Sequence, residues 1–385
     1  MSDVRPVSSP TAPAFPEGLP LVRPRVRDAG AVAKVMREIV ESGVLTNGPY
    51  VRRFEQEAAD YLDVRHCIAV SSCTAGLMLV LRAANLKGDV IVPSFTFAAT
   101  AHAIRWNGLH PMFADIDPQT LTLSAEAVER AAGIRTSAIL ATHIYGTPCD
   151  VEALTAVADR AGLQLFFDAA HAFGSRHGDR PVGGFGAAEV FSLSPTKVLF
   201  AAEGGIIATN DDALAERCRI GRDYGHPGDY NCRFVGLNAR MSEPHAVVAL
   251  ASFEDLDQRI DERNDTVRKL RAALGDVPGV EFPVVPAGDR STFKDFTILV
   301  DPEVFGMSAD ELGAALRAEG VETKRYYAPP VHRMIAYEGS IASNGSLQAT
   351  DRASSRALTL PLWSGMTDDH VARLAGAVER IQRGG

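Results

Sequence analysis

The chain has 385 residues, 46% of them hydrophobic, which is enough for a large domain with a sizeable core and a second, smaller domain. Its formal net charge of -9 argues against a nucleic-acid-binding protein, because such proteins normally carry a basic stripe. Five cysteines without a CxxC pair, no run of 18 apolar residues and no signal-peptide pattern favour a cytoplasmic protein, and we expect neither a membrane span nor a metal site.

The N-terminal segment is rich in Pro and Ser and shows no periodicity. Residues 1–20 are therefore predicted to form a disordered or loosely attached arm without chemistry. Helical spacing of apolar residues follows over 31–42, where Gly43 ends the pattern, and again over 48–62.

Short β-branched runs then alternate with helical stretches such as 75–84 and 151–161. This alternation is typical of a mostly parallel sheet with helices on both faces, so we predict an α/β fold with a seven-stranded sheet in a large domain over residues 21–253. The predicted strands are 67–70, 90–93, 111–116, 137–145, 163–169, 188–194 and 205–210.

The pattern changes from about Glu254. A long charged helix over 255–274 precedes two or three strands, around 280–282 and 296–300, and helices at 308–319 and 367–383. These elements predict a smaller α+β domain over residues 254–385.

The most informative segment is 165–210, where Asp168 closes one apolar strand and Lys197 follows another. Open α/β sheets bind ligands at the carboxyl ends of their strands. A pyridoxal phosphate (PLP) enzyme needs a carboxylate to keep the pyridine nitrogen protonated and an amine to bind the cofactor aldehyde. Burial in the apolar context of Lys197 would lower its pKa and favour the neutral amine. Taken alone, each residue has a simpler interpretation, a solvent-exposed lysine and a helix-capping aspartate.

The letters around these residues, DAAHAFG from Asp168 and FSLSPTKVLF from Phe191, resemble the DegT/DnrJ/StrS family of sugar aminotransferases, which have the PLP-dependent type I fold of the aspartate aminotransferase class. The resemblance covers nearly the whole chain. Some family members replace the lysine by histidine and are dehydratases, an activity that Lys197 excludes. Further matching segments, in the family's order, are LTNGP at 45–49, SSCTAGL at 71–77, VPSFTFAAT at 92–100, LNARMSEPHAVVAL at 237–250, YYAPPVH at 326–332 and LTLPLW at 358–363.

The resemblance implies that Lys197 holds PLP as an internal aldimine and that Asp168 pairs with the ring nitrogen. Phe97 matches the aromatic residue that the family stacks on the ring. His171 stands where the family commonly has Gln, and it would pack against the ring and bind the phenolic oxygen. Its tautomer is open at this point.

A phosphate group needs backbone amides at a helix N-terminus together with hydroxyls. Ser72, Cys73 and Thr74 supply both before an apolar helix, and Ser192 adds a hydroxyl from across the site. Cys73 replaces the family's usual Gly. Without the other motifs, this segment would be interpreted as a simple helix N-cap.

Asn238 and Arg240 match a loop that, in the family, enters the active site of the neighbouring subunit, where the Asn contacts the cofactor phosphate. The resemblance therefore implies a homodimer with shared sites. Substrate contacts are predicted from the cations and hydrogen-bond donors that a sugar diphosphate requires, with a charged surface turn as the alternative for each. The candidates are Thr46, Asn47, Gly48, Tyr145, Lys324, Arg325, Tyr327 and His332.

The resemblance implies a PLP-dependent aminotransferase that moves an amino group from L-glutamate, or another amino acid, to a nucleotide-linked sugar. A TDP-4-keto-6-deoxyhexose, of the kind used to decorate natural products or surface glycans, is the primary hypothesis. A 3-keto sugar and a scyllo-inosose-like ketone remain alternatives. A binding or regulatory protein that lost the chemistry is disfavoured by the intact Asp168, Ser192 and Lys197 and by the absence of a basic helix-turn-helix segment.

Overall fold

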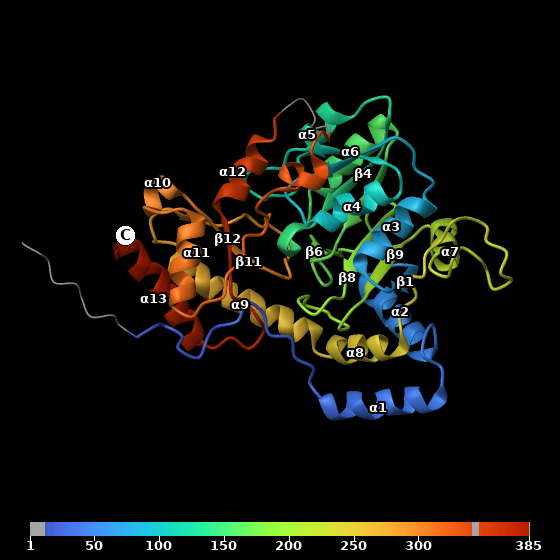
Figure 1. The fold of residues 1–385 in the computed structure, drawn as a ribbon, viewed down its shortest axis with the longest axis horizontal. Helices are drawn as coiled ribbons and strands as arrows, with labels where there is room; N and C mark the ends of the chain where they lie inside the picture. The colour runs from blue at the N-terminus through green and yellow to red at the C-terminus, as the bar shows by residue number, and fades with distance from the viewer. Residues whose placement is uncertain (1–11, 341–345, 385) are drawn as a thin grey trace, which may run out of the picture.

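The computed structural model describes residues 12–340 and 346–384. Figure 1 shows a central sheet enclosed by helices and, beside it, a smaller unit built on a second sheet, with helix α9 extending between the two. The fold confirms the predicted α/β class. The limits of the two domains at 253 and 254 stay a prediction.

The central sheet has seven strands in the order β1-β9-β8-β5-β4-β2-β3. Neighbouring strands are parallel from β8 to β3, whereas β9 is antiparallel to both β8 and β1. The predicted mostly parallel, seven-stranded sheet is thus confirmed. Its strands are β1 (His66–Val70), β2 (Asp89–Pro93), β3 (His110–Ala114), β4 (Thr136–Thr142), β5 (Gln164–Asp168), β8 (Ala188–Ser192) and β9 (Gly205–Thr209).

Helices cover both faces of this sheet, so its strands are apolar on both sides. Successive residues of a strand point to opposite faces, and in β5 Phe167 packs in one hydrophobic cluster while Phe166 packs in the other. The first cluster includes α2 (Pro49–Leu62), α5 (Ala125–Ala131), α6 (Val151–Ala161) and α8 (Glu243–Phe253). The second includes α3 (Cys73–Ala83), α4 (Ala98–Trp106) and α7 (Asp212–Gly221).

The smaller unit packs helices against an antiparallel sheet of β10 (Val280–Glu281), β11 (Phe296–Val300) and β12 (Ala357–Leu360). Its helices are α9 (Leu256–Leu274), α10 (Pro302–Phe305), α11 (Ala309–Ala318), α12 (Gln348–Arg356) and α13 (Asp368–Gly384). The short elements are β6 (Arg176–His177), β7 (Arg180–Pro181) and the 3-10 turns Ile144–Gly146, Val331–Arg333 and Ile335–Tyr337.

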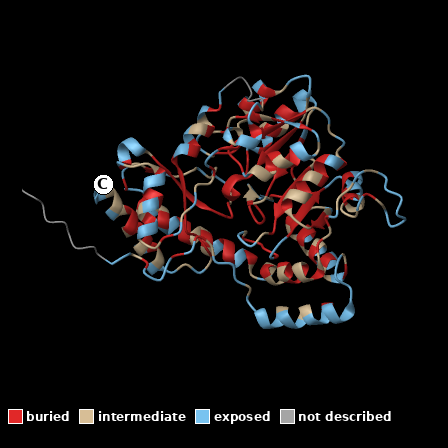
Figure 2. Ribbon diagram, in the orientation of Figure 1, coloured by how far each residue is buried: buried red, intermediate tan, exposed pale blue. Residues whose placement is uncertain are grey.

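Helix α1 (Ala29–Ser42) lies beside α8 at the edge of the molecule and is exposed along most of its length (Figure 2). Among the described residues, none of the helices combines the length and the apolar character needed to cross a membrane.

The N-terminal segment differs from the expected loose arm. Residues 1–11 lie outside the described part of the chain, but Phe15 and Leu19 are 1% and 2% exposed and pack in the core of the smaller unit. Their backbone N–H groups donate to the carbonyl oxygens of Glu319 and Gly320 at 2.9 and 2.8 Å. The prediction is corrected for residues 14–20, because two large apolar side chains among the prolines are enough to anchor this stretch.

Candidate active site

A cavity of about 260 Å³ lies at the carboxyl ends of β5 and β8 and beside the start of α3. All the predicted cofactor residues except Asn238 line it. They come from four separate segments of the chain, so the fold brings together side chains that are more than 100 residues apart. The lining residues among them are Ser72, Cys73, Thr74, Phe97, Asp168, His171, Ser192 and Lys197.

Asp168 ends β5 and is 4% exposed. The Thr100 hydroxyl donates to its Oδ2 at 2.7 Å, and the Ala170 N–H donates to its Oδ1 at 3.1 Å. Burial raises the pKa of Asp168, while these two hydrogen bonds and the charge of Lys197 oppose the rise. Asp168 is thus a buried carboxylate held in one orientation, and a cation placed in the cavity would stabilise its charge.

Lys197 is partly exposed at the cavity wall, in the loop after β8. Burial lowers its pKa from 10.5 to about 8, and the positive charge of Lys294 lowers it further. A lysine with this pKa has an accessible neutral amine close to physiological pH, as a nucleophile or proton carrier requires.

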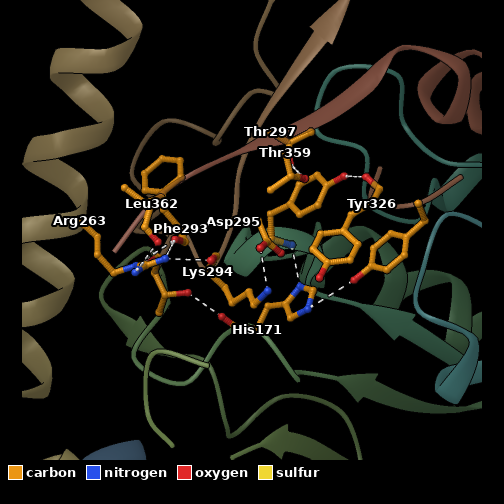
Figure 3. A network of polar contacts seen from close by, with 12 residues as sticks. His171, Arg263, Phe293, Lys294, Asp295, Thr297, Tyr326, Thr359 and Leu362 are labelled. Carbon is orange, nitrogen blue, oxygen red and sulfur yellow. Dashed lines mark hydrogen bonds and ion pairs between the residues drawn. The ribbon is translucent and has the colours of Figure 1, made fainter. Parts of the chain in front are cut away.

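His171 is 7% exposed, and its tautomer follows from one hydrogen bond. The backbone N–H of Tyr145 donates to Nδ1 at 3.1 Å, so Nδ1 is an acceptor and the neutral ring carries its proton on Nε2. Burial lowers the pKa of His171 well below its ordinary value, and Lys197 and Lys294 add to the effect. The neutral ring therefore has an Nε2–H donor, 3.5 Å from the Tyr327 hydroxyl (Figure 3).

The start of α3 has the features of an anion site. The Ser72 hydroxyl accepts the N–H of Ala75 at 3.1 Å, which leaves the N–H groups of Cys73 and Thr74 as the first orphan donors of the helix. Gly205 of β9 passes directly behind them, since a Cβ on it would lie 2.6 Å from the Cys73 nitrogen. The Cys73 Sγ lies 3.6 Å from the Val190 carbonyl, on the sheet side, so a cysteine fits where the family usually has glycine.

Phe97 is 60% exposed although it is a large aromatic residue, and it stands at the cavity edge as the N-cap of α4. Its ring centroid is 6.4 Å from that of Tyr327. Phe95, two residues earlier, is fully buried. Phe97 is thus the residue of this pair that offers a free ring to a planar ligand.

The predicted substrate residues are more dispersed. Tyr327 lines the cavity, and Tyr145 is buried next to it with a parallel ring at 6.5 Å. The turn at 46–48 does not line the cavity, because it is bound to the start of α8. The Thr46 hydroxyl donates to the Met241 carbonyl at 3.0 Å, the Gly48 N–H donates to Glu243 at 2.9 Å, and Asn47 lies between them.

Lys324, Arg325 and His332 also lie outside the cavity lining. Lys324 is exposed, and its backbone pairs with that of Thr359. The Arg325 guanidinium donates to the Ala357 carbonyl at 2.7 Å, in a structural role. The His332 Nδ1 is 2.7 Å from the Ser94 hydroxyl. The structure thus does not bring these three residues to the cavity of their own chain, because polar groups of the fold already bind the side chains of the last two.

Asn238 and Arg240 lie outside this cavity as well. Asn238 is exposed, and Arg240 pairs with Asp223 at 3.2 Å and donates to the Asn238 amide oxygen at 3.3 Å. The expected role of this loop in the site of a second subunit stays a prediction.

Sequence reasoning missed further residues of this cavity or next to it. Among them are Thr100, which donates to Asp168, and Lys294 and Tyr326, which line the cavity. Lys294 could have been identified from the charged pair KD inside the apolar run TFKDFTILV, which predicts a buried strand. Charged side chains are rarely buried unless they are paired, so such a pair indicates a special role. Among the described residues, no group of acidic, His or Cys side chains is suited to a metal ion.

The sequence model of the DegT/DnrJ/EryC1/StrS aminotransferase family matches residues 27–379. The chain belongs to this family. The predicted family, the PLP-dependent type I fold and the assignment as an aminotransferase are thereby confirmed.

One solved structure and two curated proteins are similar to this chain over most of their length. The crystal structure of DesI in the presence of its TDP-sugar product has a TM-score of 0.91 and 38% identity, covering 96% of this chain and 94% of that one. The dTDP-4-amino-4,6-dideoxy-D-glucose transaminase of Shigella dysenteriae is 32% identical over 87% of this chain and 91% of its own length. A pleiotropic regulatory protein of Geobacillus stearothermophilus is 34% identical over 88% and 91%.

Proposed function

We propose that this aminotransferase transfers an amino group from L-glutamate to a TDP-4-keto-6-deoxyhexose. The observation that carries the proposal is the single cavity that joins a buried carboxylate, Asp168, to a lysine whose pKa is about 8, Lys197, beside a helix N-terminus with two orphan amides. The names of DesI's product and of the Shigella enzyme support a TDP-linked sugar.

The residues present fit PLP. The cofactor, when bound, supplies an electron sink and a carbonyl that accepts an amino group. The amides of Cys73 and Thr74, with the hydroxyls of Thr74 and Ser192, would hold its phosphate. Asp168 would pair with the ring nitrogen, and the Nε2–H of His171 would donate to the phenolic oxygen.

Lys197 has two tasks. It would hold the cofactor through its Nζ and, once displaced by the incoming amine, move the proton between the donor's α-carbon and the cofactor. Its lowered pKa suits both, because a neutral amine attacks and accepts a proton. The same features weigh against a regulator that lost the chemistry, since such a protein has no need for a lysine with a lowered pKa at a polar cavity.

The test is to convert the cofactor of the purified protein to its amino form with L-glutamate and to follow the visible absorbance. The protein is then mixed separately with TDP-4-keto-6-deoxyglucose, a 3-keto isomer and scyllo-inosose. Return of the visible band with TDP-4-keto-6-deoxyglucose alone supports the proposed substrate. Return with the 3-keto isomer or with scyllo-inosose would assign the enzyme to that substrate class instead. Lys197→Ala should abolish turnover, and Lys269→Met, on the exposed face of α9, is the matched control.

The homodimer is part of the proposal. If the loop at 237–240 completes the neighbouring site, Lys197→Ala and Asn238→Ala variants mixed during refolding should form hybrids with one intact site and recover up to about a quarter of the activity, by random pairing of two subunits. No recovery in a mixture shown to contain hybrids would contradict shared sites. A cytoplasmic location also stays a proposal, to be tested by fractionation of the producing cells.

A further inference from the structure

A second lysine lines the cavity that contains Lys197. Lys294 is 3% exposed and comes from the smaller unit, just before β11. Its Nζ lies 2.7 Å from Asp295 Oδ1 and 5.2 Å from the ring centroid of Tyr326. Figure 3 shows this ammonium pointing toward the His171 side of the site. A buried cation is thus held at the wall of a ligand cavity.

The hydrogen bonds of this ion pair are incomplete. An ammonium has three donors, and within the described residues the Nζ of Lys294 makes one hydrogen bond, to Asp295. Asp295 is 3% exposed, and its Oδ2 is buried without a hydrogen-bond partner in the described part of the chain. Buried polar groups are nearly always satisfied, so the two unused donors of Lys294, which lines the cavity, indicate a ligand that accepts them.

The backbone around Lys294 is held in place by α9. The Arg263 guanidinium, 6% exposed, donates to the Phe293 carbonyl at 2.6 Å and to the Lys294 carbonyl at 2.8 Å. The Lys294 N–H donates to the Tyr145 carbonyl at 2.9 Å. Two elements, α9 and the turn at Tyr145, therefore fix the backbone of Lys294, and its side chain reaches the cavity wall beside Asp295 (Figure 3).

The two substrates of a transamination differ in charge at the reacting carbon. An amino acid has a carboxylate on that carbon, whereas a keto sugar has neutral neighbours. Lys197 is needed for proton transfer, so the anion requires another cation. Lys294 is the other cation among the cavity-lining residues of the described chain.

We propose that Lys294 binds the α-carboxylate of the amino donor and returns to Asp295 when the uncharged sugar ring occupies the same position. The inference rests on the proposed aminotransferase function. Lys294 would thereby let one position in the cavity accept a carboxylate and an uncharged ring in turn, because its ion pair with Asp295 forms again once the keto acid has left.

The test uses the PLP-loaded enzyme and treats the two half-reactions separately. Lys294→Met should raise the half-saturating concentration of L-glutamate about 10- to 100-fold, the equivalent of one lost charge-assisted hydrogen bond. The limiting rates of both half-reactions should fall by one common, smaller factor, because loss of the Lys294 charge raises the pKa of Lys197, which serves both. The half-saturating concentration of 4-aminobutyrate, which is glutamate without its α-carboxylate, should not change. Lys269→Met serves as the control.

Binding without reaction gives an independent measurement. Glutarate, a dicarboxylate that lacks the amine, should bind the wild-type holoenzyme in calorimetry, and Lys294→Met should weaken it by a similar factor. Asp295→Asn keeps the cation and removes its competing anion, so it should bind glutarate at least as tightly as the wild type. This variant keeps the proposal testable if Lys294→Met does not fold.

An equal rise in the half-saturating concentrations of both substrates, unchanged glutarate binding in Lys294→Met, or weaker glutarate binding in Asp295→Asn would overturn the proposal. Failure of the proposed function has a different signature, a PLP-loaded wild-type enzyme that binds glutarate but reacts with none of the keto compounds.

Discussion

The lowered pKa of Lys197 makes a prediction about stability as well as chemistry. Its pKa is about 8 in the folded, cofactor-free chain and 10.5 in the reference state. Between these values the unfolded chain binds more protons than the folded one, so stability rises with pH through this window. Below pH 8 Lys197 is charged in both states, and the fold carries the full cost of burying the charge. At 1.36 kcal/mol per pKa unit, this loss of folding stability is about 3 kcal/mol at pH 7 and about 1 kcal/mol at pH 10.

Lys197→Met removes the titrating group and keeps a side chain of similar length. The cofactor-free variant should therefore exceed the wild type in free energy of unfolding by about 3 kcal/mol at pH 7 and by about 1 kcal/mol at pH 10. Urea unfolding of both proteins at the two pH values measures this difference directly. In Lys269→Met, which alters an exposed lysine, the change should be the same at both pH values.

Two results would refute this reasoning. A variant that is less stable than the wild type at pH 7 would show that the ammonium of Lys197 stabilises the fold. A stability difference that is equal at pH 7 and pH 10 would show that its pKa is not lowered by the surrounding fold.

Three further outcomes are expected. Thr100→Val removes the hydroxyl that donates to Asp168 at 2.7 Å, so the pKa of that carboxyl should rise further. PLP binding, measured by absorbance titration, should weaken at least about tenfold. Unchanged affinity would contradict the role given to Asp168. Glu243→Ala should lower the free energy of unfolding by about 3 to 5 kcal/mol in urea, because three backbone N–H donors at the start of α2, two of them buried, lose their acceptor. Phe15→Ala should lower the free energy of unfolding by about 3 to 5 kcal/mol, measured through the fluorescence of Trp363 in the same hydrophobic cluster. A change near zero would support the original prediction of a loosely attached arm.

The positions of the proposed catalytic pair, Asp168 and Lys197, were predictable because their signals are local. Asp168 follows an apolar run that could only be a buried strand, and the carboxyl end of such a strand faces the ligand site whatever the rest of the fold does. Lys197 follows the next parallel strand, so both residues reach the same edge of the sheet. The helix N-terminus at Ser72 is equally local, since a capping residue and the apolar helix after it are adjacent in sequence.

Contacts with the smaller unit were not predictable. Lys294 is 97 positions after Lys197 and reaches the cavity because Arg263 of α9 holds the loop before β11 against the turn at Tyr145. The charged pair inside the apolar run at 292–300 could have marked Lys294 as buried, but it does not record which part of the fold Lys294 packs against. Arg325 and His332 are residue types that often bind anions, but they lie outside the cavity. Their side chains instead bind a carbonyl of α12 and the Ser94 hydroxyl just after β2.

The sequence alone thus determined the sheet, the edge at which the cavity lies and the two residues, Asp168 and Lys197, that line it from neighbouring strands. Strand periodicity and strand ends are properties of short segments, so they can be predicted without the tertiary structure. The tertiary structure decided the tautomer of His171, the anchoring of Phe15 and which cation of the smaller unit enters the cavity. Each of these depends on a contact between segments far apart in the chain, and the free energy of such a contact exists only once both segments have packed.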